Sequence, residues 1–190
     1  MNIILCDLNS WLADAWKHEF RYEQNVKIIQ GNILDIEDFN AIVAAGNSFG
    51  IMDGGLDALY VRKWGEQLQD RVRQDIIDWN DGYLPVGESI NLGLRSRTDC
   101  EKSLIYTPTM TVPMDVSDSI NVFLSFQTAL LTAEDIGTET LLCPGLGTGT
   151  GNMNPKVAAK QMYFAFRGFK LNGRTWQEIQ QKINFLKEAV

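Results

Sequence analysis

The sequence contains a single histidine, which restricts the catalytic chemistry available to the chain. A Ser–His–Asp or Cys–His arrangement, or a phosphohistidine intermediate, would require this residue, His18, to lie in the active site. His18 falls on the polar side of a helix predicted over residues 11–20, together with Asp14 four residues earlier. We interpret the two side chains as a solvated i, i+4 pair, so histidine-dependent catalysis is disfavoured.

Cysteine is also scarce, and its placement argues against a metal site. The three cysteines, Cys6, Cys100 and Cys143, are odd in number and lack the spacing of metal ligands. No cluster of histidines, cysteines or carboxylates has that spacing either, so we expect no metal and no cofactor. Cys6 and Cys143 lie in strand-like runs, which predicts small, buried thiols.

Long hydrophobic runs are missing from the sequence as well. No apolar run approaches the roughly 18 residues that a membrane-spanning helix needs. The opening residues, MNIILCDLNSW, are too short and carry no basic flank for a signal peptide. These features predict a soluble protein in the reducing environment of the cytoplasm, without membrane contact.

Positive charge is in deficit: 17 lysines and arginines face 24 aspartates and glutamates, for a formal net charge of -7. Such a chain repels the phosphate backbones of nucleic acids and anionic membrane surfaces, so non-specific binding to either is disfavoured. A small anionic nucleotide is still a suitable ligand, because main-chain N–H groups can hold it without any net positive charge.

Strand and helix patterns alternate along the 190 residues, a length that suits one domain. Short aliphatic runs typical of buried parallel strands are NIILC, VKII (26–29), AIVAA (41–45), SINLG, SLIYTPT and TLLCPGLG. Helical patterns cover residues 11–20 and 56–79, a segment ending at Gly137, the run from Asn154 and Pro155 toward Leu171, and TWQEIQQKINFLKEA. This alternation predicts an α/β domain with a mostly parallel sheet.

Capping residues and apolar positions give these helices predicted boundaries and buried faces. Ser10 is expected to cap the first helix, Asn154 to cap the helix that Pro155 opens, and Gly137 to follow a helix end. The residues expected to face the core are Trp11, Leu12, Ala15, Trp16 and Phe20 in the first helix, and Leu59, Leu68, Val72, Ile76 and Trp79 in the second.

Two glycine-rich loops follow predicted strands: VAAGNSFGIMDGGLD (43–57) and PGLGTGTGNMNP (144–155). In open α/β sheets, ligands bind beyond the carboxyl ends of strands, close to helix N-termini. Successive glycines leave main-chain amides free to form a concave anion site, so two such loops at one sheet edge suit a diphosphate. The second loop matches neither the P-loop G-x-x-x-x-G-K-[ST] nor the dinucleotide pattern G-x-G-x-x-G. Each loop taken alone is equally consistent with tight turns.

The ordered segments QGNILDIEDFNAIVAAGNS, GGLDAL, LPVGESI and PGLGTGTGNM resemble the macro domain, an ADP-ribose-binding module, over roughly residues 28–165. The family pattern is G-D-I, then D-A-I-V-N-A-A-N, a glycine-rich turn, V-D, and later P-x-I-S-T-G-I-Y-G. The resemblance implies a three-layer α/β/α sandwich with a mixed, mostly parallel central sheet. It further implies that residues 1–190 form a single macro domain, with a C-terminal helix at about 174–189.

The resemblance also implies which residues form the site. Asn47 closes AAGN as the family's catalytic asparagine closes N-A-A-N, and Asp57 follows it by ten residues, like the family's catalytic aspartate. Asn32 takes the place of the aspartate that accepts a hydrogen bond from the adenine amino group. The other expected ligand contacts are Ile33, Ser48, Gly54, Gly55, Leu56, Gly147, Thr148, Gly149, Thr150, Gly151, Asn152 and Met153.

Three positions depart from the family pattern. Asn32 replaces an aspartate, and its uncharged oxygen is a weaker acceptor. Ala44 replaces the first asparagine of N-A-A-N. Gly151 replaces an aromatic residue that packs on the distal ribose, and Met153 is the candidate to cover that surface instead. These changes loosen the expected hold on the distal ribose.

The segment MDGGLDALYVRKWG (52–65) also resembles the pattern of a second branch of the family, M-G-x-G-I-A-x-x-F-x-x-x-F-G of the deacylating macro proteins. Those proteins employ a lysine, and Lys63 is only a neighbour of its position. The phage- and bacterium-type macro proteins, which include ADP-ribose 1″-phosphate phosphatases, resemble the chain more closely.

The resemblance favours hydrolysis of an ADP-ribose conjugate, either ADP-ribose 1″-phosphate or an ADP-ribosyl ester on a macromolecule. Asn47 would orient the distal ribose, and Asp57 would activate a water near C1″ as a general base. Asp57 is also consistent with a carboxylate placed for the helix dipole alone, and Asp53 is the rival as base or helix cap. The alternative is a reader that binds ADP-ribose without turnover, and a third hypothesis is another nucleotide-binding α/β protein.

Overall fold

The computed structural model describes residues 1–94 and 101–171 of the chain. Cys100 and the helix predicted at about 174–189 lie outside these residues. Within the described residues, no helix is both long and apolar enough to cross a bilayer.

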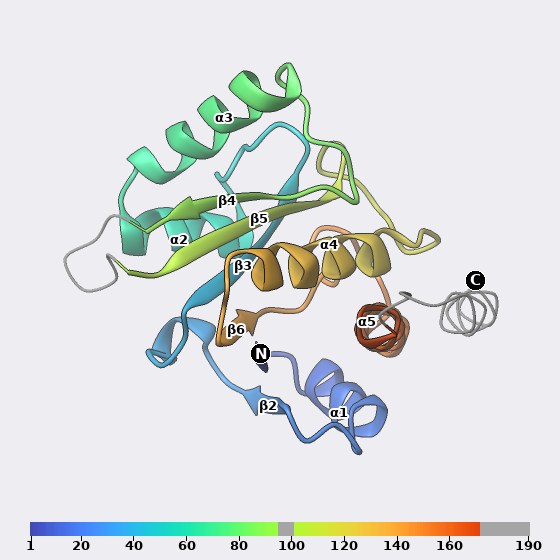
Figure 1. Cartoon of the computed structure of the whole chain (residues 1–190). Helices are drawn as coiled ribbons and strands as arrows, with labels where there is room; N and C mark the ends of the chain where they lie inside the picture. Colours follow the sequence, from blue (N-terminus) through green and yellow to red (C-terminus); the bar gives the residue numbers. More distant parts are fainter. Residues whose placement is uncertain (95–100, 172–190) are drawn as a thin grey trace.

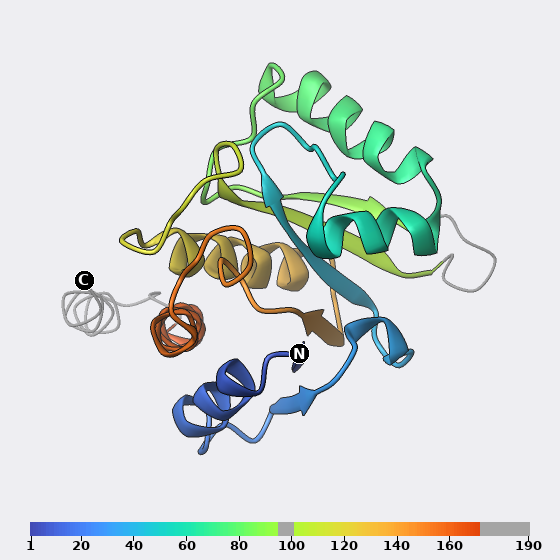
Figure 2. The same cartoon turned by 180° about the vertical axis from the view of Figure 1, so that it is seen from behind.

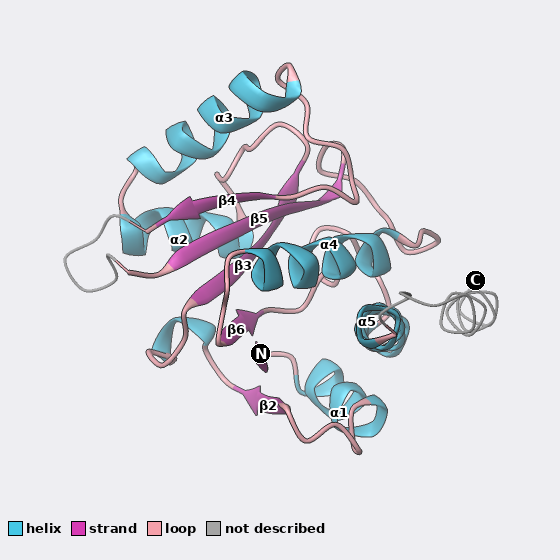
Figure 3. Cartoon of the chain, in the orientation of Figure 1, coloured by secondary structure: helices cyan, strands magenta, loops and turns pink. Residues whose placement is uncertain are grey.

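In the described part of the chain, six strands form one sheet in the order β2-β1-β6-β3-β5-β4 (Figures 1 and 3). The strands are β1 (Asn2–Asp7), β2 (Val26–Gln30), β3 (Ala41–Asn47), β4 (Ile90–Gly93), β5 (Ser103–Met110) and β6 (Thr140–Cys143). The β4–β5 pair is antiparallel and the other four pairs are parallel. The predicted mixed, mostly parallel sheet is therefore confirmed.

Among residues 1–94 and 101–171, five α-helices cover the two faces of this sheet (Figures 1 and 2). They are α1 (Ser10–Glu19), α2 (Gly55–Trp64), α3 (Gln67–Asn80), α4 (Asn121–Asp135) and α5 (Pro155–Lys170), and a short 3-10 helix, η1 (Ile33–Asp35), follows β2. Helices α1, α4 and α5 pack on one face and α2 and α3 on the other, which gives the predicted three-layer α/β/α sandwich.

A separate hydrophobic cluster lies between the sheet and the helices on each of its two faces, and strand β3 contributes residues to both clusters. Val43 joins the cluster of Trp16 and Phe126, whereas Ile42 and Ala44 join the cluster on the opposite face. Alternate residues of a strand point to opposite faces, so a central strand covered on both sides has to be apolar throughout. This requirement explains the run AIVAA and keeps β3 buried up to its carboxyl end.

The predicted helix over residues 56–79 is in fact two helices. Gly65 ends α2 with φ 98°, and its N–H donates to Val61 O at 2.8 Å before α3 begins at Gln67. The apolar periodicity continues across the break, which is why the pattern predicted one helix. The single glycine was the available signal, since it adopts positive φ without steric cost.

Two of the predicted helix caps are confirmed and one is wrong. Asn154 caps α5 ahead of Pro155, and Gly137, with φ 70°, follows the end of α4. The first helix is capped by Asn9 and not by Ser10, because the Asn9 side chain accepts from Trp11 N at 3.0 Å and Leu12 N at 3.4 Å. An asparagine is as good a cap as a serine, so composition did not separate the two neighbours.

Three apolar residues predicted to face the core are instead exposed: Trp11 at 76%, Trp79 at 81% and Leu59 at 37%. Helical periodicity identifies positions that share a face but not how far the sheet extends beneath each helix. The other residues predicted for the two faces are buried, apart from Ala15, which is half-buried against the core; they are Leu12, Trp16, Phe20, Leu68, Val72 and Ile76.

The predicted surroundings of the histidine and the cysteines are partly confirmed. His18 is solvated, with 72% of its side chain exposed, but its Nδ1 lies 3.2 Å from Glu19 Oε1 while Asp14 pairs with Lys17. The predicted His18–Asp14 pair is therefore wrong. Cys6 and Cys143 are buried free thiols, and burial raises the pKa of both, to about 11 for Cys6.

Candidate functional site

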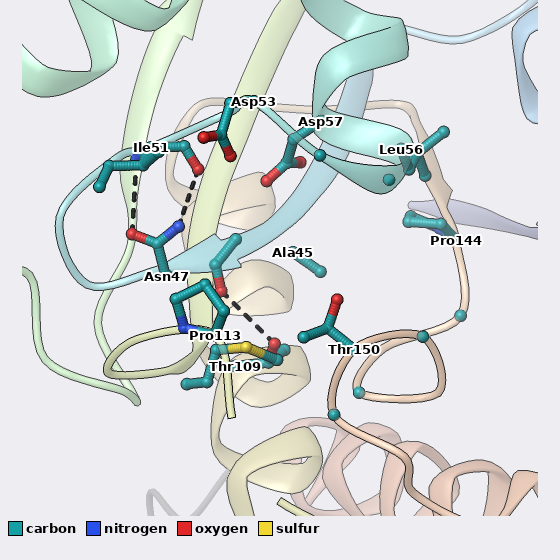
Figure 4. A pocket seen from close by; sticks show the side chains of 18 residues that line it. Ala45, Asn47, Ile51, Asp53, Leu56, Asp57, Thr109, Pro113, Pro144 and Thr150 are labelled. Carbon is teal, nitrogen blue, oxygen red and sulfur yellow. Dashed lines mark hydrogen bonds between the residues drawn. The ribbon is translucent and has the colours of Figure 1, made fainter. Parts of the chain in front are cut away.

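A cavity of about 180 Å³ opens at the carboxyl ends of β3, β5 and β6 (Figure 4). Its lining comes from the loop before α2, from the segment that ends β5 and continues toward α4, and from the loop between β6 and α5. Strands β3 and β6 are adjacent and parallel, so their carboxyl ends point to the same edge of the sheet, and residues from both predicted glycine loops line this cavity. The lining that the described residues provide includes two carboxylates, Asp53 and Asp57, and no lysine, arginine or histidine.

The predicted ligand residues divide into two groups. Those that line the cavity are Asn47, Gly54, Gly55, Leu56, Asp57, Gly147, Gly149, Thr150 and Gly151. Those that do not are Asn32, Ile33, Ser48, Thr148, Asn152 and Met153. The structure adds Ala45, Gly46, Ile51, Asp53, Thr109, Met110, Pro113, Pro144 and Gly145 to the lining.

Asn47 is the last residue of β3, and Tyr106 of β5 fixes its main chain. The β3–β5 register shifts between Gly46 and Asn47, which interrupts the regular ladder. Across the gap the Tyr106 hydroxyl accepts from Asn47 N at 2.9 Å and donates to Asn47 O at 2.8 Å. A side chain on Gly46 would overlap this ring, so a glycine is required beside it. Both buried polar groups of the Asn47 main chain are thereby satisfied.

The Asn47 side chain organises the turn that follows β3. Its Oδ1 accepts from Phe49 N at 3.1 Å and Ile51 N at 3.4 Å, and its Nδ2 donates to Ile51 O at 2.7 Å (Figure 4). A primary amide has two donor hydrogens and two acceptor lone pairs. One N–H of Asn47 is left to meet a ligand, because both lone pairs and the other N–H serve the turn.

Asp57 lies in the first turn of α2 and points its carboxyl into the cavity (Figure 4). Burial raises its pKa from 3.8 to about 7. This effect outweighs the helix N-terminus, which favours an ionised carboxylate and so acts in the opposite direction. Within the described residues, no hydrogen-bond donor reaches the carboxyl. A partly buried acid without a protein partner, titrating near neutrality, suits proton transfer to a bound molecule.

Asp53 is not the cap of α2. The N-cap is Gly54, and no side chain accepts a hydrogen bond from the first turn of this helix. Asp53 is exposed and its carboxyl points into the same space as that of Asp57 (Figure 4). The predicted capping role for Asp53 is therefore wrong, whereas its position in the cavity keeps it as a second carboxylate beside Asp57.

Two groups of free main-chain amides face the cavity. At the start of α2, the N–H groups of residues 54–57 have no acceptor within the described residues, as expected at an uncapped helix N-terminus. In the loop after β6, the N–H groups of residues 147–151 likewise have no acceptor in the part of the chain that is described. Consecutive free amides of this kind form anion-binding concavities.

The loop after β6 is held in shape by the segment between β5 and α4. Val116 N donates to Gly151 O at 2.9 Å, and Asn152 Nδ2 donates to Asp115 Oδ2 at 2.9 Å. A Cβ on Gly151 would lie 2.6 Å from Gly147 O and 2.7 Å from Val116 Cγ2, so this position has no room for a side chain. The aromatic residue that the family pattern places at Gly151 is therefore excluded sterically, and Pro113 lines the cavity from this segment.

Several expected ligand contacts occupy other places in the fold. Met153 is 2% exposed in the hydrophobic core, so the expectation that it covers the distal ribose is wrong. Ser48 is fully buried, and Ile33 is 5% exposed. Asn32 caps η1 by accepting from Leu34 N at 3.1 Å and donates to Asp35 Oδ1 at 3.0 Å, outside the cavity lining.

Lys63, the neighbour of the deacylase lysine position, does not reach the cavity either. Its Nζ donates to Leu34 O at 2.6 Å and lies 5.6 Å from the centre of the Trp64 ring. Among the described residues, no group of three or more histidines, cysteines or carboxylates is arranged to hold a metal ion. The chemistry of the cavity is therefore carried by Asn47, the two aspartates and the free amides.

Sequence comparison finds that residues 43–162 match the model of the macro domain family. An uncharacterized protein of Aquifex aeolicus is 29% identical over 146 residues, which cover 77% of this chain and 83% of that protein. Among solved structures, the Oceanobacillus iheyensis macrodomain with ADP is similar, with a TM-score of 0.63 and 18% identity over 84% of this chain and 90% of that one. Thermosipho africanus DarTG in complex with ADP-ribose gives a TM-score of 0.61 and 14% identity, covering 82% of this chain and 47% of that one.

Proposed function

The chain belongs to the macro domain family, and on this premise we propose that its cavity binds ADP-ribose with the diphosphate held by main-chain amides. The observation that carries the proposal is that residues with free N–H groups from two segments line one cavity: residues 54–57, and Gly147, Gly149, Thr150 and Gly151. The similar Oceanobacillus macrodomain is a structure with ADP, and DarTG is one in complex with ADP-ribose, which supports the same ligand class.

Amide donors explain how an acidic chain would hold an anionic ligand. Each hydrogen bond to a charged group contributes about 1.5–3 kcal/mol, and the α2 N-terminus adds about 0.3–1 kcal/mol. Several such donors acting together offset the net charge of -7, which is spread over the whole molecule. No lysine or arginine is needed at the diphosphate.

We further propose that the protein hydrolyses an ADP-ribose derivative at C1″, with Asp57 as general base. Water attacks C1″ and Asp57 takes its proton, while the C1″–O bond breaks and its electron pair leaves with the phosphate or the carboxylate of the acceptor. A pKa of about 7 leaves Asp57 largely able to accept a proton just above neutral pH. The free N–H of Asn47 orients a ribose hydroxyl. Asp53 is the rival base in the same cavity.

A reader that binds ADP-ribose without turnover is the second candidate function. The observation that favours it is the engagement of both Asn47 Oδ1 lone pairs by Phe49 N and Ile51 N. In that arrangement the amide oxygen cannot also position an attacking water. In either case the macromolecular partner would be one that carries ADP-ribose, and we propose a cytoplasmic setting on the sequence grounds given above.

Two measurements on the native chain and Asp57→Asn test these proposals. Calorimetry is expected to show ADP-ribose binding more tightly than AMP or ATP to both proteins; a preference for AMP or ATP would contradict the ligand assignment. Release of ADP-ribose from its 1″-phosphate and from ADP-ribosylated protein is expected to fall at least 100-fold in Asp57→Asn. If the native chain and Asp57→Asn both bind ADP-ribose but release it equally slowly from these substrates, the hydrolase proposal is contradicted and the reader function is favoured.

A further inference from the structure

We infer that Asp53 is a specificity-determining residue that selects against a phosphate group on C1″ and favours ADP-ribosyl groups joined to uncharged or cationic acceptors. This inference rests on the proposed function of the cavity. It predicts which of the two substrates considered above is preferred. A 1″-phosphate adds negative charge beyond that of the diphosphate, whereas an ester or an N-glycoside at C1″ does not.

The cavity is electrostatically asymmetric. Free amides from residues 54–57 and 147–151 supply the donors for a diphosphate. The carboxyls of Asp53 and Asp57 point to the Asn47 side of the cavity, away from Pro144 (Figure 4). Since no lysine, arginine or histidine among residues 1–94 and 101–171 lines the cavity, a second anionic group on the Asn47 side would face carboxylates without a compensating cation from these residues.

A phosphate monoester carries a charge of about -1.5 to -2 near neutral pH. Repulsion between like charges a few ångströms apart at a protein surface exceeds thermal energy several-fold. The single free N–H of Asn47 compensates this repulsion only weakly, because its other side-chain donor and both acceptor sites bond the turn that leads to Ile51. An acetyl or peptide ester adds no charge at this place, and a guanidinium acceptor would be attracted.

Asp53 is better placed than Asp57 for this selection. It is exposed, it precedes the N-cap Gly54, and no hydrogen bond within the described residues ties its carboxyl to the fold. Its charge therefore acts on what enters the cavity and not on the stability of α2. Asparagine has nearly the same shape without the charge, so Asp53→Asn isolates the electrostatic contribution.

The experiment compares ADP-ribose, ADP-ribose 1″-phosphate and O-acetyl-ADP-ribose by competition with a fluorescent ADP-ribose analogue, read within seconds of mixing so that turnover is negligible. The native chain is expected to bind the 1″-phosphate at least tenfold more weakly than ADP-ribose and the acetyl ester within threefold. In Asp53→Asn, the ratio of the Kd for the 1″-phosphate to the Kd for ADP-ribose is expected to fall at least threefold. Asp118→Asn, which removes an exposed carboxylate outside the lining, should leave the ratio of the two Kd values unchanged.

The outcomes separate the two levels of the argument. The role of Asp53 is overturned if the native chain binds ADP-ribose and its 1″-phosphate equally well. It is also overturned if the ratio of the two Kd values is the same in Asp53→Asn as in the native chain. In both cases the proposal that the cavity binds ADP-ribose is unaffected. Failure of ADP-ribose itself to bind overturns the proposed function and this inference together. A thermal melt of each variant shows that the comparison is made on folded protein.

Discussion

At the scale of single residues, Asp57 combines properties that rarely coexist in a carboxylate without a role. It is partly buried, lacks a donor among the described residues and has a pKa raised to about 7 by burial. An aspartate kept only for the helix dipole would be expected to show a lowered pKa. Local chemistry thus favours the functional interpretation of Asp57 over the purely structural one.

The raised pKa predicts that Asp57 lowers stability at neutral and alkaline pH. The folded-state pKa is about 7 and the ordinary value is 3.8, so the unfavourable ionisation in the folded state develops as pH rises between these values. Asp57→Asn should match the native chain near pH 4 and become the more stable protein above pH 7. Each unit of pKa shift corresponds to about 1.4 kcal/mol, so the difference is at most a few kcal/mol.

Urea unfolding of the native chain and Asp57→Asn at pH 4.5, 6 and 8 measures this difference. The matched control is Asp118→Asn, which removes an exposed carboxylate outside the cavity lining. A stability difference for Asp57→Asn that stays constant with pH would show that the Asp57 carboxyl ionises as it does in water.

At the scale of elements, the site depends on an irregularity between β3 and β5. The register shift between Gly46 and Asn47 interrupts the regular ladder of main-chain hydrogen bonds. The Tyr106 hydroxyl bonds both the N–H and the C=O of Asn47 in its place. The strand pattern SLIYTPT predicts β5 but not this contact, because a tyrosine in an aliphatic strand looks like ordinary core. Its partner Gly46 was visible in the sequence, though only as a bend.

Tyr106→Phe should weaken both the fold and the cavity. The ring stays in the core, while the buried N–H of Asn47 loses its partner, at a cost of about 1–3 kcal/mol. The Asn47 carbonyl loses one of its two bonds and keeps the one from Gly50 N at 3.2 Å. We expect the affinity for ADP-ribose to fall several-fold as the Asn47 turn loosens. Calorimetry and urea unfolding of the same samples provide the two readouts.

Tyr60→Phe is the matched control for this prediction. It removes another buried hydroxyl, which donates to Val43 O at 3.1 Å and makes no bond to Asn47. This variant should lose stability and keep its affinity for ADP-ribose. If both variants bound ADP-ribose like the native chain, Tyr106 would be a core residue without influence on the site.

Elements were easier to predict than the contacts between them. Periodicity located the sheet strands and most helices, because buried strands and amphipathic helices require apolar residues at fixed intervals. It missed the break at Gly65 and the burial of Met153, since neither follows from local spacing. The lining by Thr109, Met110 and Pro113 was also missed, because the end of β5 and the segment after it have no glycine pattern and join the cavity only through tertiary packing.

At the scale of the whole molecule, the fold brings together amides from two loops about ninety residues apart in sequence. The sheet order places β3 next to β6, so the loops that follow these strands share one cavity. The two glycine loops and their meeting at one sheet edge were predictable from the sequence. The distribution of charge within the cavity was not, because it depends on the directions of the Asp53 and Asp57 side chains.

The most direct test of the account is an amide ¹H–¹⁵N titration of the full chain with ADP-ribose. We expect the amides of residues 54–57 and 147–151 to shift together with a single Kd, while amides at the amino ends of β3 and β5, near Ala41 and Ser103, stay in place. Saturable binding that leaves both amide groups unshifted would contradict the central claim that the main chain of these two loops holds the diphosphate.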